Sequence, residues 1–280
     1  MKEKKSRTSV GLFQYTALIV LSIATLFPLV WMALSSLKTT DEMFAVPLQL
    51  FPKEMQWHHF VDAFKLAPFG IYLQNSIVTS FLIVIFQIGL SCMVAYGLTQ
   101  IKFKGRNLIF HSLLLSYMLP SAVTYVPSYV ILAKLNLLDS LTGIVISNIG
   151  SVFSIFLLRQ TFLNIPKEVL EAARVEGASD WRILWRVMVP MAKSSIFTLS
   201  IITFIQMYNN YLWPSIIVKS QDKYLITVGL RQFFTMQGAF AAQWPLIMAV
   251  NVITVIPLLI VFIVFQKWLI KGIGDSGVKG

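Results

Sequence analysis

The segment from Asn164 to Pro190 is a charged stretch within an otherwise apolar chain, and it begins with the pattern of a short helix. Pro166 suits the first helical position, where a missing N–H costs nothing, and Glu168 and Glu171 would lie near the positive end of the helix dipole. Gly177 supplies the backbone freedom that a helix C-terminus usually needs. Charged and small side chains in this pattern suit noncovalent docking to another protein.

A second helix is predicted directly after the glycine. Ser179 can cap it, and Pro190 would stop it. Four apolar residues recur on one face at the spacing i, i+3, i+4 and i+7: Trp181, Leu184, Trp185 and Met188. Arg182 and Arg186 lie on another face. We expect an amphipathic helix of this kind to lie along a membrane surface rather than to cross it.

Val169, Ala172 and Ala173 would give the first helix a smooth side of small residues. Another protein's surface could approach this side closely, while the flanking charges fix its orientation. An ordinary solvated loop is the alternative interpretation.

The fixed spacing of this segment resembles a signature of bacterial ATP-binding-cassette importers. In the cytoplasmic loop of their membrane subunits, E-A-A is followed after three residues by G and after nine more by I-x-L-P. The corresponding residues of this chain are Glu171, Ala172, Ala173, Gly177, Val187, Val189 and Pro190, with valine at both aliphatic positions. The resemblance implies that the first helix docks into a groove on an ATPase subunit. The residues that it assigns to this coupling are Glu171, Ala172, Ala173 and Gly177, with the neighbouring Arg174 and Glu176.

Composition places the chain in a membrane. Of its 280 residues, 56% are hydrophobic and only 12% are charged, with a mean hydropathy of +0.73. A soluble domain of this length could not cover so much apolar surface. About 20 apolar residues cross the hydrocarbon core, and we place six spans at about 12–35, 71–99, 108–133, 141–163, 194–217 and 245–270. We therefore predict an all-α polytopic membrane protein with six transmembrane helices.

The distribution of Lys and Arg predicts the orientation of these spans. The two ends of the chain, the loop between spans two and three and the charged segment together hold 16 of the 23 basic residues. The other three connecting segments hold 7. Because cytoplasmic segments carry the excess of Lys and Arg, both termini and the charged segment are predicted to be cytoplasmic.

Residues from about 71 to 265 resemble the transport core of the carbohydrate-uptake branch of these importers. The likeness is to the smaller permease of the maltose and multiple-sugar systems, and it lies in AYGL at 95–98, MLPSAVTYVPSYVIL at 118–132 and IQMYNNYLWP at 205–214. It implies the type I importer permease fold in three parts. Residues 1–70 would form a cytoplasmic tail, the first transmembrane helix and an external segment, 71–270 the transport core with the EAA loop at about 164–193, and 271–280 a cytoplasmic tail.

Several kinds of chemistry are missing from the sequence. No phosphate-binding G-x-x-x-x-G-K-[ST] occurs, so the chain cannot itself use ATP by that mechanism, and no Ser/His/Asp set or nucleophile elbow is present. His58 and His59 do not predict a metal site, because adjacent histidines point to different faces of a helix and have no companion at ligand spacing. We expect no enzymatic activity, metal or cofactor in this chain, with ATP and Mg²⁺ in a partner ATPase.

Uncharged polar residues within the spans are the candidates for a solute pathway. Amides and hydroxyls are the donors and acceptors that a neutral polyhydroxylated solute needs. The candidates are Asn75, Gln87, Tyr125, Asn148, Gln206, Asn209, Asn210 and Trp213. Hydrogen bonds between neighbouring helices are the alternative role for each of them. Pro120 and Pro127 could break span three where it lines a cavity.

We therefore expect a permease subunit of an ATP-driven, binding-protein-dependent sugar or oligosaccharide importer in the bacterial plasma or inner membrane. It would form half of the translocation pathway. The resemblance implies a second permease, two cytoplasmic ATPase subunits and an extracytoplasmic solute-binding protein as partners, and no nucleic acid. A different permease is the expected partner, and the sequence leaves a homodimer open.

Three alternatives differ in the machine or in its solute. The first is a similar importer for a non-sugar solute, such as an amino acid, phosphate or metal chelate; an anionic solute would favour basic groups facing a cavity. The second is an ion-coupled secondary carrier, which commonly keeps an acidic residue within a span, whereas every acidic residue here falls outside the six spans. The third is a membrane sensor or scaffold without transport.

Overall fold

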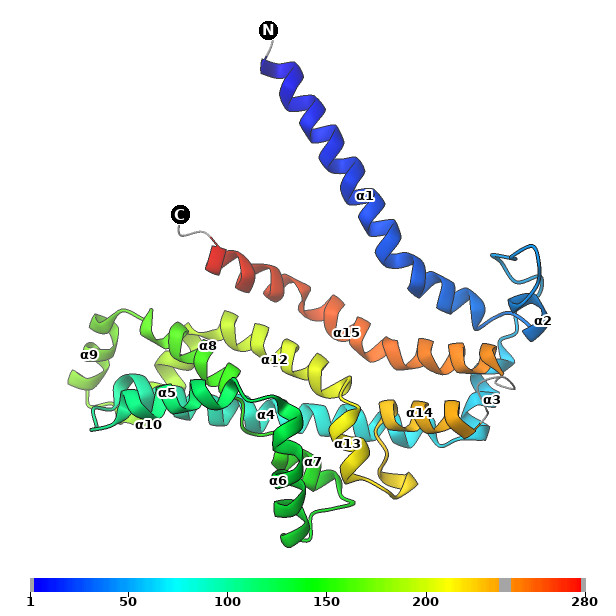
Figure 1. Ribbon diagram of the computed structural model, residues 1–280. Coiled ribbons are helices and arrows are strands. Elements are labelled where there is room, and N and C mark those ends of the chain that lie inside the picture. The colour runs from blue at the N-terminus through cyan, green and yellow to red at the C-terminus, as the bar shows by residue number, and fades with distance from the viewer. Residues whose placement is uncertain (1–2, 237–242, 278–280) are drawn as a thin grey trace. The chain divides into compact units, whose positions relative to one another are not determined.

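The computed structural model describes residues 3–236 and 243–277, and within these ranges the chain forms helices and turns but no strand (Figure 1). The all-α prediction is confirmed for these residues. The predicted cytoplasmic tail at 271–280 lies only partly within them.

The chain divides into two compact units. The N-terminal unit is Met1–Phe69 with Leu230–Ile256, and the core unit is Gly70–Gly229 with Pro257–Gly280. The three-part division expected from the sequence stays a prediction.

The N-terminal unit begins with α1 (Glu3–Ser35), followed by α2 (Thr40–Met43) and α3 (His58–Leu66). From Phe13 to Val30, most large apolar side chains of α1 are exposed, as expected for a helix that faces lipid. Lys38 fixes the chain just beyond α1. Its buried Nζ donates a 2.6 Å hydrogen bond to the Gln49 carbonyl oxygen.

The helices that follow belong to the core unit, except that α14 and α15 cross the boundary between the units. Their bounds are α4 (Phe69–Gln100), α5 (Arg106–Tyr117), α6 (Ser121–Lys134), α7 (Leu141–Ser147), α8 (Val152–Leu163), α9 (Lys167–Val175), α10 (Asp180–Ile183), α11 (Val189–Met191), α12 (Lys193–Tyr208), α13 (Leu212–Ile217), α14 (Ile226–Met236) and α15 (Trp244–Gly277).

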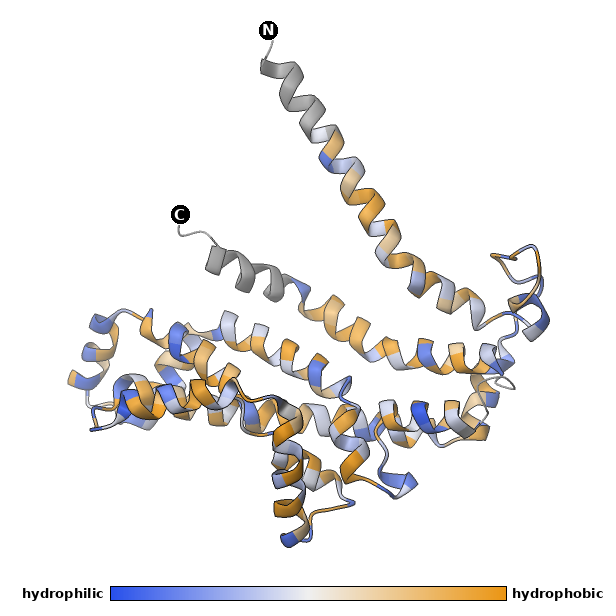
Figure 2. Cartoon of the chain, in the orientation of Figure 1, coloured by the Kyte–Doolittle hydropathy of each residue, from blue (hydrophilic) through white to orange (hydrophobic). Residues whose placement is uncertain are grey.

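The apolar helices are long enough to account for the predicted spans, although not all are continuous (Figure 2). Phe13–Ser35, Phe69–Gln100 and Trp244–Gln266 can each cross a membrane alone. Three bent helix pairs bring the possible spans to six, namely Arg106–Tyr117 with Ala122–Lys134 at 106°, Leu141–Ser147 with Val152–Leu163 at 46°, and Asp180–Met191 with Lys193–Tyr208 at 81°. Predicted span three is thus broken beside Pro120, as its prolines suggested.

Span five differs from its prediction as one helix over 194–217. α12 ends at Tyr208, and the separate helix α13 begins at Leu212. Irregular backbone at membrane depth is tolerated where it is buried in protein or lines a water-filled cavity. The residues at the break are therefore candidates for lining such a cavity.

The long helix α4 organises the core unit through two apolar clusters. Toward its C-terminal end, Cys92, Tyr96 and their neighbours pack with residues of α8, α9, α10 and α12. Nearer its N-terminal end, Ile83 packs with residues of α6, α7 and α13. Between the two clusters, Gln87 donates from Nε2 to Ser154 Oγ at 3.0 Å and to Thr203 Oγ1 at 3.2 Å. The short helices α6, α7 and α13 therefore form one packed group, which is distinct from the group around α8 and α12.

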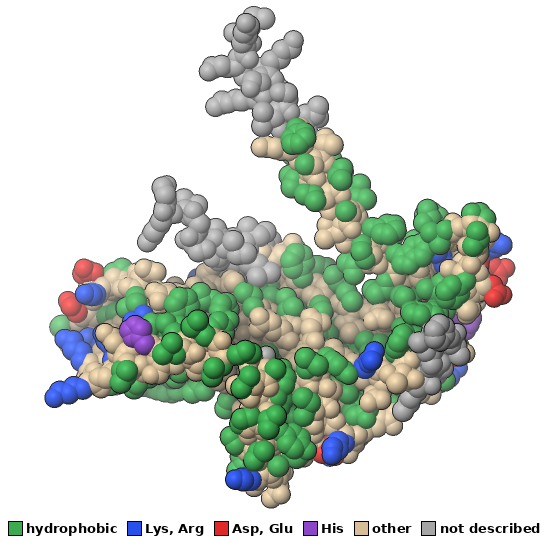
Figure 3. Space-filling view, viewed as in Figure 1, with side chains coloured by type: hydrophobic (Ala, Val, Ile, Leu, Met, Phe, Trp, Pro, Cys, Tyr) green, Lys and Arg blue, Asp and Glu red, His purple; other side chains and the backbone are tan. Residues whose placement is uncertain are grey.

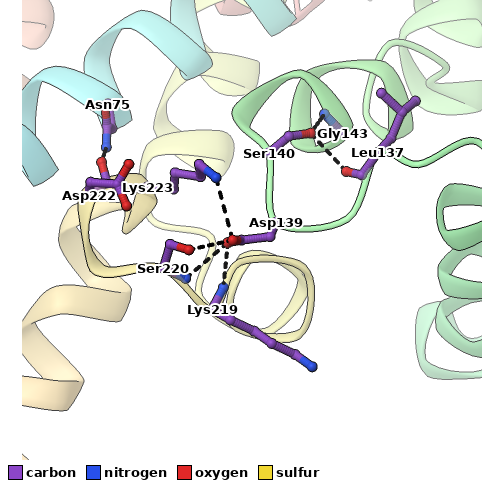
Figure 4. Close-up of polar contacts among 9 residues, drawn as sticks. All are labelled: Asn75, Leu137, Asp139, Ser140, Gly143, Lys219, Ser220, Asp222 and Lys223. Atoms are coloured by element: carbon purple, nitrogen blue, oxygen red, sulfur yellow. Dashed lines mark hydrogen bonds and ion pairs between the residues drawn. The ribbon is translucent and has the colours of Figure 1, made fainter.

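A single carboxylate joins the two connecting segments next to this short-helix group (Figure 4). Asp139 Oδ1 accepts from the backbone N–H groups of Lys219 and Ser220, each at 2.9 Å, and Oδ2 accepts from the Ser220 hydroxyl. Lys223 Nζ lies 3.4 Å from Oδ2. These donors, the Ser220 hydroxyl first, hold the pKa of Asp139 well below its usual range. The carboxylate thus ties the loop before α7 to the loop after α13.

Candidate coupling site and solute pathway

Helix α9 ends in a hydrogen-bonded glycine stop. Gly177 has a φ of +77°, a conformation that glycine adopts without the cost that a Cβ imposes. Its N–H donates to the Arg174 carbonyl at 3.0 Å, and the N–H of Ala178 donates to the Ala173 carbonyl at 3.0 Å. This pair of bonds is the Schellman pattern, which satisfies the last carbonyls of a helix. The prediction that Gly177 ends the first helix is confirmed.

The two sides of α9 have different surroundings. Leu170 is buried and Ala173 is partly buried, and both belong to the apolar cluster shared with α4, α8 and α12. Glu171 and Ala172 are exposed, and Val175 at the end of the helix is 89% exposed. An apolar tip on a charged, outward-facing helix suits contact with another protein.

Ala173 corrects the predicted smooth side of α9. Val169 and Ala172 face outward, but Ala173 packs against the chain's own apolar core. The reason is the helical period: residue 173 follows the buried Leu170 by three positions and shares its face. Arg174 and Glu176 are also exposed, and charged side chains gather at this end of the core unit (Figure 3).

The second helix begins as predicted, but it does not lie bare on a membrane surface. The Ser179 hydroxyl accepts from the Arg182 N–H at 3.4 Å at the start of α10. Leu184 and Met188 are buried against residues of α4 and α8, so other helices cover this apolar face, while Trp181 stays 64% exposed. Helical periodicity identified the shared face but could not tell protein from lipid as its cover.

Pro190 does not stop this helix at once. The turn Leu184–Met188 is π-helical, and α11 continues to Met191 before the chain bends into α12. A proline ring clashes with the carbonyl four residues earlier, here that of Arg186, and a widened turn at that point relieves the clash.

Tyr96 links α4 to this segment. Its buried hydroxyl donates a 2.5 Å hydrogen bond to Asp180 Oδ1 at the start of α10. No local sequence pattern pointed to this pair, which is separated by 84 residues, or to the exposed Val175. Tyr96 does lie within the AYGL stretch that carries part of the family likeness.

Most of the predicted pathway residues bond to other parts of the chain. Gln87 is buried and bridges α8 and α12, as described above. Asn75 Nδ2 donates to the carbonyls of Asp222 and Tyr224 at 2.9 and 3.1 Å. Asn148 Nδ2 donates to the Ile144 carbonyl at 2.8 Å. These amides fix helices and loops in the conformation observed.

Trp213 is also engaged within the protein. It is only 4% exposed, its ring stacks on Tyr125 with centroids 5.1 Å apart, and its Nε1 donates to Ser147 Oγ at 2.8 Å. These contacts join α13 to α6 and α7. In this conformation the Trp213 ring is therefore occupied by contacts within the protein.

Gln206, Asn209 and Asn210 lie at or just before the break in span five. Gln206 and Asn209 are exposed. Asn209 uses Nδ2 for the Ile205 carbonyl at 2.9 Å, a bond that does not involve its Oδ1 acceptor. The Asn210 carbonyl accepts from the Thr227 hydroxyl at 2.8 Å, which ties the break to α14. The structure thus separates Gln206 and Asn209 from the other candidates as the amides with exposed polar atoms.

Comparisons with known proteins agree with this architecture. Residues 87–275 match the family described as binding-protein-dependent transport system inner membrane component. The chain is 34% identical over 278 residues to the sn-glycerol-3-phosphate transport system permease protein UgpE of Yersinia enterocolitica, covering 97% of this chain and 99% of that protein. It is 32% identical over 267 residues to the arabinooligosaccharides transport system permease protein AraQ of Bacillus subtilis, covering 94% and 93%.

A solved structure shares the fold. A chain of a bacterial ABC transporter involved in the import of the acidic polysaccharide alginate aligns with a TM-score of 0.83 at 23% identity, covering 94% of this chain and 97% of that one. With the family match over more than half of its length and relatives matched nearly end to end, this chain belongs to the binding-protein-dependent transport system inner membrane components, the permease subunits of ABC importers.

Proposed function

We propose that this permease carries a sugar or another neutral polyhydroxylated solute. The relatives above are named for sn-glycerol-3-phosphate and for arabinooligosaccharides, which are both polyhydroxylated. Gln206 and Asn209 expose amide groups at the helix break in span five, and amides pair with sugar hydroxyls as donors and acceptors. The solute would meet these two residues as it passes the break.

A phosphorylated polyol is the second candidate, favoured by the relative named for sn-glycerol-3-phosphate. An anionic group in a membrane pathway calls for a basic partner. No Lys or Arg occurs between Lys193 and Lys219, the stretch that contains the break. This sequence fact favours the neutral solute.

Coupling to ATP would run through the exposed face of α9. Glu171, Ala172 and Val175 would enter a groove on a cytoplasmic ATPase subunit, with Arg174 and Glu176 beside them and Gly177 setting the angle to the next helix. Hydrolysis of ATP with Mg²⁺ would take place in that partner. The observation that carries this proposal is an outward-facing helix with an apolar tip, held in place by a glycine stop and a buried inner side.

The assembly would hold this chain, a second and different permease, two ATPase subunits and an extracytoplasmic solute-binding protein. Both termini and the EAA segment (residues 164–193) would face the cytoplasm. The excess of Lys and Arg in the corresponding segments supports this orientation.

An uptake assay with the complex reconstituted in liposomes tests the proposal. Uptake of labelled neutral oligosaccharides and of glycerol 3-phosphate is compared in the presence of the binding protein, with ATP inside the compartment that holds the ATPase subunits. We expect ATP-dependent uptake of a neutral sugar. Uptake that persists without ATP while an ion gradient is held would favour a secondary carrier instead, and uptake of glycerol 3-phosphate alone would favour the anionic solute.

A further inference from the structure

The loop between α4 and α5 gathers positive charge within five residues. Lys102, Lys104 and Arg106 lie there, and both lysines are exposed. Gly105 turns the chain into α5 with a φ of +90°. In Figure 3, Lys and Arg side chains gather at the left end of the view, where α4 and α5 meet in Figure 1.

Among the side chains that the structure describes, no carboxylate forms an ion pair with these three residues. The ion pairs found there join Lys65 to Asp62 and Lys223 to Asp139. Arg106 Nη1 donates to the Thr99 carbonyl at 3.2 Å, a bond that leaves the charge of the guanidinium uncompensated.

A further cation lies close to the loop. Arg159 of α8 packs against α5, the helix that Arg106 begins. The Arg159 guanidinium carbon lies 3.9 Å from the centroid of the Phe110 ring, and Nε is buried without a hydrogen-bond partner in the structure. Positive charge is therefore concentrated here against an apolar background, which favours the binding of an anion.

The loop also borders an open hollow. The segment from Lys102 to Leu108 lines a hollow of about 640 Å³. The backbone N–H groups in the first turn of a helix have no acceptor within the helix. In α5, neither a capping side chain nor an acidic residue occupies that turn. Basic side chains and unpaired N–H donors in one hollow match the oxygens of a phosphate group.

Large apolar side chains border these charges. Ile101, Phe103, Leu108 and Ile109 are all exposed, Leu108 by 72%. A purely aqueous anion gains nothing from such neighbours. A ligand with a phosphate joined to hydrocarbon chains contacts both parts of the surface.

We propose that this hollow, lined by Lys102 to Leu108, binds the phosphate headgroup of an anionic phospholipid, such as phosphatidylglycerol. Lys102, Lys104 and Arg106 neutralise the headgroup, and the exposed apolar side chains contact its acyl chains. The proposal rests on the orientation given under the proposed function, in which this loop meets the anionic cytoplasmic leaflet. An acidic surface of the ATPase subunit is the competing occupant, and the apolar border favours the lipid.

The test uses the purified whole transporter in a neutral detergent. Dioctanoyl phosphatidylglycerol is titrated, with dioctanoyl phosphatidylcholine as the neutral comparison, and bound lipid is counted by native mass spectrometry. The test variant is Lys102→Gln/Lys104→Gln/Arg106→Gln. The matched control is Lys4→Gln/Lys5→Gln/Arg7→Gln, which removes the same charge from the same predicted side of the membrane and leaves the EAA segment intact.

We expect the test variant to bind phosphatidylglycerol at least about tenfold more weakly than the wild type, with the control variant close to the wild type. Hydrogen exchange should also show protection of residues 101–109 by phosphatidylglycerol and not by phosphatidylcholine. Equal loss in both variants would overturn the proposal, because general attraction to the membrane would then explain the binding. Unchanged lipid binding with loss of the ATPase subunit from the test variant would also overturn it, in favour of a protein contact.

Inorganic phosphate distinguishes a lipid site from a simple anion site. Displacement of the lipid by millimolar phosphate alone would count against a lipid pocket. Wild-type uptake, measured separately, keeps this proposal distinct from the proposed function: normal uptake without specific lipid binding would remove the lipid site and leave the importer function standing.

Discussion

The Tyr96 hydroxyl donates a 2.5 Å hydrogen bond to Asp180 Oδ1 and so joins the long helix α4 to the first residue of α10. The same helix holds the Asp222 loop through Asn75 near its other end, and α8 and α12 through Gln87 in between. Movement of α4 would therefore be passed directly to the EAA segment.

Tyr96→Phe removes this link without changing the shape of the ring. A hydrogen bond to a charged group contributes about 1.5–3 kcal/mol, so the EAA segment should lose its fixed position relative to α4. We expect the number of ATP molecules hydrolysed per solute imported to rise, with membrane level retained. Tyr117→Phe, on the exposed side of α5, is the control. An unchanged ratio in the Tyr96 variant would mean that the bond plays no part in coupling.

Gly177→Val tests the glycine stop of α9. A Cβ at this position would meet no atom within 4 Å, so the cost arises from the backbone at φ +77° and is about 1 kcal/mol or more. Gly177→Asn is the matched variant, because Asn tolerates the left-handed conformation better. We expect Val to reduce uptake and co-purification of the ATPase, and Asn to preserve most of both. Equal effects of Val and Asn would show that the backbone conformation is not the cause.

Ala172 is exposed, whereas its neighbour Ala173 packs against the apolar cluster. The same substitution at the two positions should therefore cause two different defects. Ala172→Asp places a charge on the exposed face and should weaken ATPase binding while the permease stays folded. Ala173→Asp places the charge against the apolar cluster and should lower the free energy of unfolding of the permease by several kcal/mol. We therefore expect a lower melting temperature and a lower level in the membrane. ATPase co-purification and thermal melting are measured together for both. The same defect in both variants would contradict the assignment of the two faces.

Features of this region that depend on adjacent residues could be predicted from the sequence. Contacts between residues far apart along the chain could not. Gly177 and Ser179 were identifiable because helix stops and caps depend on adjacent residues, and Pro120 marked a break for the same reason. A hydropathy window averages over 20 residues, so it could not detect the interruption after Tyr208. The partners of Trp213 and Tyr96 come from distant parts of the chain, and no periodicity reports them.

Asp139→Asn tests the carboxylate that joins the loop before α7 to the loop after α13. The native pKa lies below that of the unfolded chain, so the stabilisation is present above about pH 4 and is lost as the pH falls toward the native pKa. We expect the variant to lose on the order of 1 kcal/mol at pH 7, or about 2–4 °C in melting temperature. The difference from the wild type should shrink below pH 4. Asp222→Asn, an exposed carboxylate in the loop after α13, is the control, and an equal loss there would point to a general charge effect.

Gln206→Leu and Asn209→Leu test the solute pathway at the break in span five. Both side chains are exposed, and neither holds two helices together, so Leu should leave the fold intact. Loss of a hydrogen bond to a sugar hydroxyl costs about 0.5–1.5 kcal/mol, which predicts a several-fold rise in the solute concentration for half-maximal uptake. ATP hydrolysis stimulated by the liganded binding protein should persist, because α9 and the Tyr96–Asp180 bond are untouched.

Gln87→Leu is the structural comparison: it removes a buried bridge to Ser154 and Thr203 and should lower the melting temperature instead. Normal uptake by both exposed-amide variants would remove Gln206 and Asn209 from the pathway, and a lowered melting temperature in them would assign these amides to the fold.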